Sequence, residues 1–89
     1  MRYQLVLQFT ENLCGDLDCI IETEHRLIER LVHAEVDGHE IGNGEVNIFI
    51  LTNNPVETFE SVKNILESSG VDFENVKVAY KDLKNEAIK

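Results

Sequence analysis

Glu24 and His39 are the residues of this chain whose types and expected positions could support acid–base chemistry. At about 100° per residue, Glu24 falls in the middle of an apolar helical stripe, where an unpaired carboxylate must find a donor or keep its proton. His39 is expected on the sheet face under that helix, so we expect the two side chains to lie within about 6 Å of each other. A buried Glu–His pair can serve a small-molecule enzyme or sensor as an acid–base dyad, but it is more often a structural hydrogen bond.

The other reactive residue types form no recognisable catalytic or metal-binding motif. Cys14 and Cys19 have the wrong spacing for the common zinc sites, and no second Cys or His pair follows at a ligand spacing. Gly42-Asn43-Gly44 imitates a phosphate-binding loop, but it joins two strands and opens no helix. We therefore expect no metal, no cofactor and no enzymatic activity. No secretory signal precedes the cysteines, so reduced thiols and a cytoplasmic location are expected.

Changes of hydrophobic period divide the chain into the elements that must position these residues. Residues 3–9 alternate like a half-buried strand, and a helix follows the N-cap residue Asp16. The apolar side of this helix is expected to comprise Leu17, Ile20, Ile21, Leu27, Ile28 and Leu31. A second helix begins after an Asn54 cap and ends near Gly70, and residues 76–80 form the last strand.

Asn43-Gly44 is the clearest local signal, because Asn-Gly between apolar residues is typical of a two-residue hairpin turn. The turn predicts a register in which Gly42 pairs with Glu45, Ile41 with Val46, and His39 with Ile48. The two strands of the hairpin are expected to span residues 37–42 and 45–52.

The resulting element order, β-α-β-β-α-β, predicts a single domain over residues 1–89. With right-handed crossovers, the economical packing is a four-stranded antiparallel sheet of order 4-1-3-2 with both helices on one face. This is the ferredoxin-like α+β sandwich, which hosts many unrelated functions.

The net charge of −9 arises from 17 acidic and 8 basic side chains, and residues 11–45 hold ten of the acids and two of the bases. A nucleic-acid-binding protein usually shows a basic patch, and a membrane-spanning helix needs about 18 apolar residues, so neither class is expected. We expect the acidic stretch to form a surface for a basic protein, although acidity can also serve solubility alone. The candidate binding residues are Asp18, Glu22, Glu29, Asp37, Glu40 and Glu45.

The sheet face away from the helices is a second candidate surface. Alternation places Val6, Asn47, Phe49 and Leu51 there, which would give an apolar patch with polar surroundings. Either the tail at residues 81–89 covers this patch or two copies of the chain pair through it as a homodimer.

The segment from Asp37 to Ile50 resembles a D-G-x-x-x-G-x-G-E-x-N-I-F-I pattern found around a hairpin in small uncharacterised bacterial proteins. That resemblance implies no activity. In size and acidity the chain also resembles bacterial immunity proteins, which neutralise cationic nuclease toxins by covering their active sites.

These observations favour a small, non-catalytic protein-interaction module, with toxin neutralisation as its specific form. Two alternatives remain open. One is a small-molecule sensor or enzyme built around Glu24 and His39, and the other is a structural homodimer.

Overall fold

The computed structural model describes residues 2–10 and 17–83 of the chain. The elements are β1 (Tyr3–Thr10), α2 (Leu17–Arg30), β2 (Ala34–Gly42), β3 (Glu45–Thr52), α3 (Pro55–Ser68), the short 3-10 helix η1 (Phe73–Asn75) and β4 (Lys77–Asp82). The expected N-cap Asp16, Cys14 and the tail beyond Leu83 lie outside the described residues.

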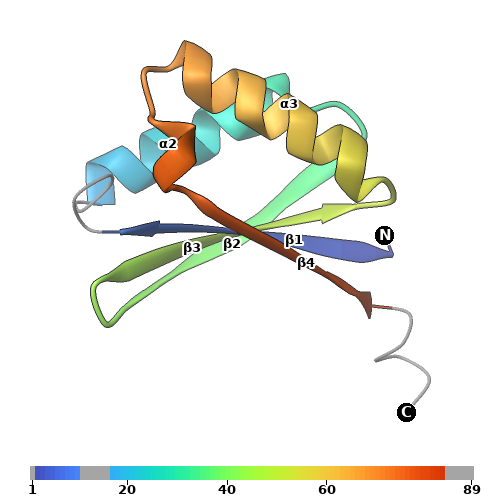
Figure 1. The fold of residues 1–89 in the computed structure, drawn as a ribbon, viewed down its shortest axis with the longest axis horizontal. Coiled ribbons are helices and arrows are strands. Elements are labelled where there is room, and N and C mark those ends of the chain that lie inside the picture. The colour runs from blue at the N-terminus through green and yellow to red at the C-terminus, as the bar shows by residue number, and fades with distance from the viewer. Residues whose placement is uncertain (1, 11–16, 84–89) are drawn as a thin grey trace.

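The four strands form one antiparallel sheet of order β2-β3-β1-β4, and both helices lie on the same face of it (Figure 1). The order is the expected 4-1-3-2 counted from the other edge, so the ferredoxin-like α+β fold is confirmed. No helix in the described ranges is both long and apolar enough to cross a membrane.

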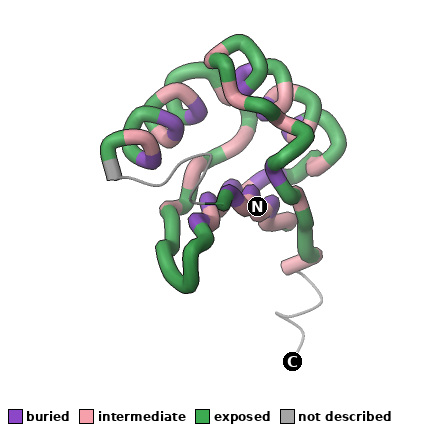
Figure 2. Tube along the Cα trace, turned by 60° about the vertical axis from the view of Figure 1, so that its left-hand side comes forward, coloured by how far each residue is buried: buried purple, intermediate pink, exposed green. Residues whose placement is uncertain are grey.

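The core fills the space between the sheet and the two helices. In the central strands β1 and β3, every second residue is buried, and Figure 2 shows this burial following the strands and the inner sides of the helices. The core comprises Leu5, Leu7, Phe9, Ile20, Leu27, Val46, Ile48, Ile50, Val62, Ile65, Leu66 and Val76. β2 and β4 are the edge strands, and they contribute far less to it.

The β2–β3 hairpin has the predicted turn and register. Asn43 and Gly44 have φ values of 52° and 77°, as a two-residue turn with positive φ requires. Gly42 pairs with Glu45, Ile41 with Val46, and His39 with Ile48. However, β2 begins at Ala34 rather than near residue 37, because a bulge between Val36 and Gly38 interrupts the alternation. A two-residue period cannot be followed across such an insertion.

Both ends of α3 follow the sequence prediction. The Asn54 side chain accepts a hydrogen bond from the Glu57 backbone N–H at 3.1 Å, and Pro55 occupies the first helical position. At the other end, the Gly70 N–H donates to the Glu67 carbonyl and the Val71 N–H to the Leu66 carbonyl. This pair of bonds, with Gly70 at a φ of 85°, is the Schellman arrangement.

The inward face of α2 differs from the predicted stripe. Ile21 and Ile28 are 39% and 59% exposed, whereas Thr23 is buried among the core residues. Thr23 can be buried because its hydroxyl donates to the Cys19 carbonyl oxygen at 2.8 Å. The predicted stripe therefore included Ile21 and Ile28 wrongly and omitted Thr23, and the side chain of Leu17 lies outside the described part of the chain.

Candidate functional site

The predicted contact between Glu24 and His39 is present, with 2.8 Å between Glu24 Oε1 and His39 Nδ1. α2 passes over the edge strand β2, and Glu24 lies on the flank of the helix that faces this strand. The predicted burial is wrong, since the Glu24 side chain keeps 13% of its surface exposed and the His39 side chain 30%. The edge position explains this difference, because no further strand lies beyond β2 in the described sheet.

The Glu24–His39 pair links an element of the helical layer to an element of the sheet. Within the described residues, neither Glu24 nor His39 lines the groove between α3 and β4, the pocket between α2 and the end of α3, or the pocket beside β1 and β4. The geometry therefore fits a structural hydrogen bond better than a dyad poised over a substrate.

The predicted acidic residues are all exposed, but they occupy two different surfaces. Asp18, Glu22 and Glu29 lie on the side of α2 opposite the buried Ile20 and Leu27, so they point away from the sheet. Asp37, Glu40 and Glu45 lie on the β2–β3 hairpin. The expectation of one continuous acidic surface is therefore wrong, because the helix and the hairpin turn their carboxylates in different directions.

Some of these carboxylates have local partners. Glu22 Oε1 lies 2.6 Å from Arg26 Nη2 across one turn of α2. Glu45 Oε2 accepts a hydrogen bond from Gln8 Nε2 at 2.9 Å, which ties the hairpin to β1. Both contacts are exposed, so they leave most of the acidic character of each surface in place.

The two helices leave one face of the sheet uncovered (Figure 1), and the strand register places the residues of the predicted patch on that face. Val6 pairs directly with Phe49, while Gln4 pairs with Leu51 and Gln8 with Asn47. The side chains of Val6, Asn47, Phe49 and Leu51 are each half-buried within the chain. Asn47 Oδ1 is buried without a hydrogen-bond partner among the described residues.

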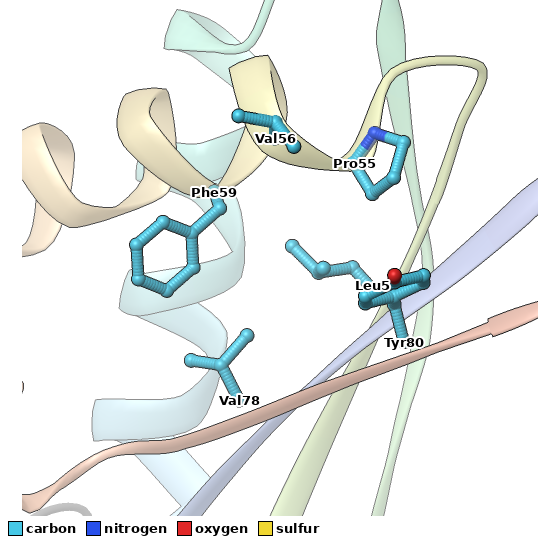
Figure 3. A pocket seen from close by; sticks show the side chains of 6 residues that line it. All are labelled: Leu5, Pro55, Val56, Phe59, Val78 and Tyr80. Carbon is cyan, nitrogen blue, oxygen red and sulfur yellow. The ribbon is translucent and has the colours of Figure 1, made fainter.

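An apolar groove between α3 and β4 was not predicted from the sequence. It has a volume of about 270 Å³ and is lined by Leu5, Pro55, Val56, Phe59, Val78 and Tyr80 (Figure 3). Val56 and Tyr80 are 73% and 63% exposed, because α3 packs over β1 and leaves the edge strand β4 partly uncovered. The available signal was the alternation in β4, which places Val78 and Tyr80 on the helix side of an edge strand.

The beginning of β1 and the end of β4 are joined by an exposed ion pair. Arg2 Nη2 lies 2.9 Å from Asp82 Oδ2, and the Leu83 N–H donates to the Arg2 carbonyl oxygen. The hydrogen bond that the Arg2 guanidinium donates to the Asp82 carboxylate, together with the negative charge of Asp82, raises the pKa of Arg2 above its ordinary value. This contact holds strand ends together and presents no catalytic group.

The cysteine and metal expectations have different outcomes. Cys19 is half-buried and disulfide-bonded, contrary to the expected reduced thiol, so the cysteines no longer support a cytoplasmic location. Among the residues that the structure describes, no group of three or more His, Cys, Asp or Glu side chains is placed to hold a metal ion.

Comparison with known proteins adds no assignment to this geometry. No family model matches the chain, and neither a curated protein nor a solved structure matches it. The two resemblances seen in the sequence therefore stay predictions, and the function has to be argued from the surfaces described above.

Proposed function

We propose that the chain is a non-catalytic protein-interaction module that binds a basic protein through its β2–β3 hairpin. The observation that carries this proposal is the exposure of every residue from His39 to Glu45. Figure 2 shows this exposed end of the hairpin extending away from the helices. We call the exposed segment of the β2–β3 hairpin that carries Asp37, Glu40, Ile41 and Glu45 the acidic hairpin.

The acidic hairpin has the composition of a docking surface. Between residues 34 and 45 there are four carboxylates and no lysine or arginine. Ile41 is 56% exposed and offers an apolar contact, but it lies on the helix side of the hairpin, whereas Glu40 and Glu45 lie on the open side. Interfaces commonly combine an apolar centre with charged surroundings, where the charges set encounter rate and orientation.

The α2 carboxylates serve a different purpose in this proposal. Asp18 and Glu29 point away from the sheet, so a partner seated on the hairpin does not contact them directly. They add to the negative field that attracts a cationic protein over a distance of about one Debye length, roughly 8–10 Å at ordinary salt.

Neutralisation of a cationic nuclease-type toxin is the specific form of this proposal. Acidic side chains that cover a basic active site exclude the phosphate backbone of the substrate by occupying the same positive groups. In this form, the wild-type chain inhibits nuclease activity and a variant with a neutralised hairpin does not.

Two variants of equal charge test the proposal. Asp37→Asn/Glu45→Gln removes two carboxylates from the hairpin, and Asp18→Asn/Glu29→Gln removes two from the helix, so each changes the net charge from −9 to −7. Titration with poly-L-lysine at low salt should show an affinity loss of about tenfold for the hairpin variant and a much smaller loss for the helix variant.

Circular dichroism and thermal unfolding would confirm that both variants remain folded, which their exposed positions favour. An equal loss in the two variants would mean that only total charge matters. A larger loss in the helix variant would place the binding surface on α2 instead.

A further inference from the structure

The charges on the open sheet face are sorted by strand. One cross-strand row on this face consists of Lys77, Gln8, Asn47 and Glu40, in the order β4, β1, β3, β2. A second row consists of Lys81, Gln4, Leu51 and Glu35 in the same order. Each of these two rows has a base on β4 and an acid on β2, and Glu45 adds a further acid on β3, the neighbour of β2, so the face is basic along one edge and acidic toward the other.

The row between these two is apolar. It consists of Ala79, Val6, Phe49 and Gly38, again in the order β4, β1, β3, β2. The smallest residues lie at the two edges, and the larger Val6 and Phe49 lie side by side on the central strands. The open sheet face therefore has an apolar middle between a basic margin and an acidic margin.

We propose that a second copy of this chain covers the open sheet face, related by a twofold axis that lies between the two sheets and runs along the strands. Such a rotation exchanges the two edges of the sheet but preserves the level of each row. Lys77 then faces Glu40 of the second copy, Val6 faces Phe49 of the second copy, and Gln8 faces Asn47 of the second copy. By symmetry, every one of these contacts forms twice.

The other twofold arrangement of two stacked sheets is disfavoured by the same charges. A twofold axis perpendicular to the strands places β2 over β2 and β4 over β4. The acidic margins then face each other, as do the basic margins, and like charges in contact oppose association. The apolar row alone would allow either twofold arrangement, but the basic and acidic margins favour the one whose axis runs along the strands.

The size of the face predicts a weak dimer. Four strands spaced about 4.8 Å apart and about 26 Å long present roughly 500 Å² per copy, or about 1,000 Å² in total. That total is near the lower limit of specific interfaces, which suits a dissociation constant in about the micromolar range. The net charge of −9 on each copy opposes pairing, so the dimer should be measured at about 0.15 M salt, where long-range repulsion is screened.

This inference goes beyond the proposed hairpin function and does not rest on it, but the two share Glu40, so a second copy and a basic partner would compete for that carboxylate. Sedimentation equilibrium of the full chain over a range of concentrations should detect the dimer. Lys77→Glu and Glu40→Lys should each weaken it by about tenfold, and the double variant should restore it, because the double variant re-forms the contact with its charges exchanged.

Glu40→Lys is the decisive variant, because it makes the net charge less negative, −7 instead of −9. This variant would strengthen pairing if only the overall repulsion between copies mattered. Glu67→Lys is the matched control, because it makes the same charge change at an exposed position of α3 on the helical layer. It should leave the dimer unchanged or slightly strengthen it.

A protein that stays monomeric up to about 1 mM would overturn the inference. A dimer that Glu40→Lys strengthens, or that the double variant fails to restore, would overturn the arrangement. The poly-L-lysine titration tests the hairpin function separately. A monomer whose hairpin variant loses affinity for poly-L-lysine would support only the hairpin function, and a dimer whose hairpin variant loses none would support only this inference.

Discussion

The Glu24–His39 contact shows that a short distance between two side chains does not by itself indicate a catalytic dyad. The two atoms are 2.8 Å apart, yet both side chains retain contact with solvent. Solvent screens the pair and supplies alternative hydrogen bonds, so its contribution to stability is that of a surface interaction. Its effect is to join the flank of α2 to an edge strand in which no residue is fully buried.

A double-mutant cycle with Glu24→Ala and His39→Ala measures this contribution. We expect a coupling free energy of about 0.2–1 kcal/mol, as for other partly exposed pairs, from urea unfolding at neutral pH. The Glu22–Arg26 pair on α2 is the comparison, with an expected coupling of about 0.3–0.5 kcal/mol. A coupling above about 2 kcal/mol would show a desolvated pair and reopen the question of a buried acid–base site.

The sequence was sufficient to predict which residues meet here but not how deeply they are buried. The Asn43-Gly44 turn sets the register of β2, and the register places His39 on the helix side of the sheet. In the structure α2 turns Thr23 inward rather than Ile21 and Ile28, and the Thr23 hydroxyl bonds within its own helix. Nothing in the residue type of Thr23 distinguishes that situation from an exposed threonine.

At the scale of elements, α3 is stabilised by well-formed ends. Asn54 caps its first turn, and behind this cap the hydroxyls of Thr52 and Thr58 lie 2.7 Å apart in the buried interior. The Asn54 N–H also donates to the Thr52 hydroxyl at 3.0 Å, so the cap and the end of β3 form one hydrogen-bonded unit.

Asn54→Ala should lower the free energy of unfolding by about 1 kcal/mol, because the Glu57 N–H then loses its acceptor. The matched control is Asn64→Ala at an exposed position within α3, where alanine's higher helix propensity should stabilise by a few tenths of a kcal/mol. Thermal and urea unfolding of both variants provide the measurement. Equal effects at the two positions would refute the capping role.

Gly70 provides a test of backbone conformation alone. A Cβ atom added at Gly70 or at Gly42 would meet nothing within 4 Å, but only Gly70 has a positive φ, at 85°. Gly70→Ala should therefore destabilise the chain by about 1 kcal/mol, while Gly42→Ala should be nearly neutral. A similar cost in both variants would mean that the difference in φ does not govern the effect.

The limits of sequence prediction at this scale lie at interruptions of a period and at edges of the sheet. The bulge between Val36 and Gly38 breaks the two-residue alternation, so the first residues of β2 were not predicted as part of the strand. The groove beside β4 was missed because helix periodicity places Val56 in an apolar stripe without saying where the underlying sheet ends. By contrast, the turn and both ends of α3 were predicted, because each depends on interactions among residues close in sequence.

At the scale of the whole molecule, the fold was predictable because the order of elements and the handedness of connections leave few packings. The distribution of charge over the surface could not be predicted in the same way. The acids that are close together in the sequence fall on a helix and a hairpin whose exposed sides face different directions. A run of acidic residues therefore predicts the sign of the field near a segment, but the tertiary structure decides which surface presents it.

The excess of acids predicts how the stability of the chain responds to salt. With 17 acidic and 8 basic side chains, most carboxylates have no opposite charge of their own, and folding brings the helix and hairpin acids nearer one another than in the unfolded chain. Added KCl screens this repulsion, so the free energy of unfolding should rise by on the order of 1 kcal/mol between about 20 and 500 mM salt. The measurement is urea unfolding at a protein concentration low enough to keep the chain monomeric. The Asp18→Asn/Glu29→Gln variant removes two of the repelling charges, so its free energy of unfolding should rise less with added salt. If the free energy of unfolding does not change with salt, or falls, local ion pairs such as Arg26 with Glu22 outweigh the overall repulsion.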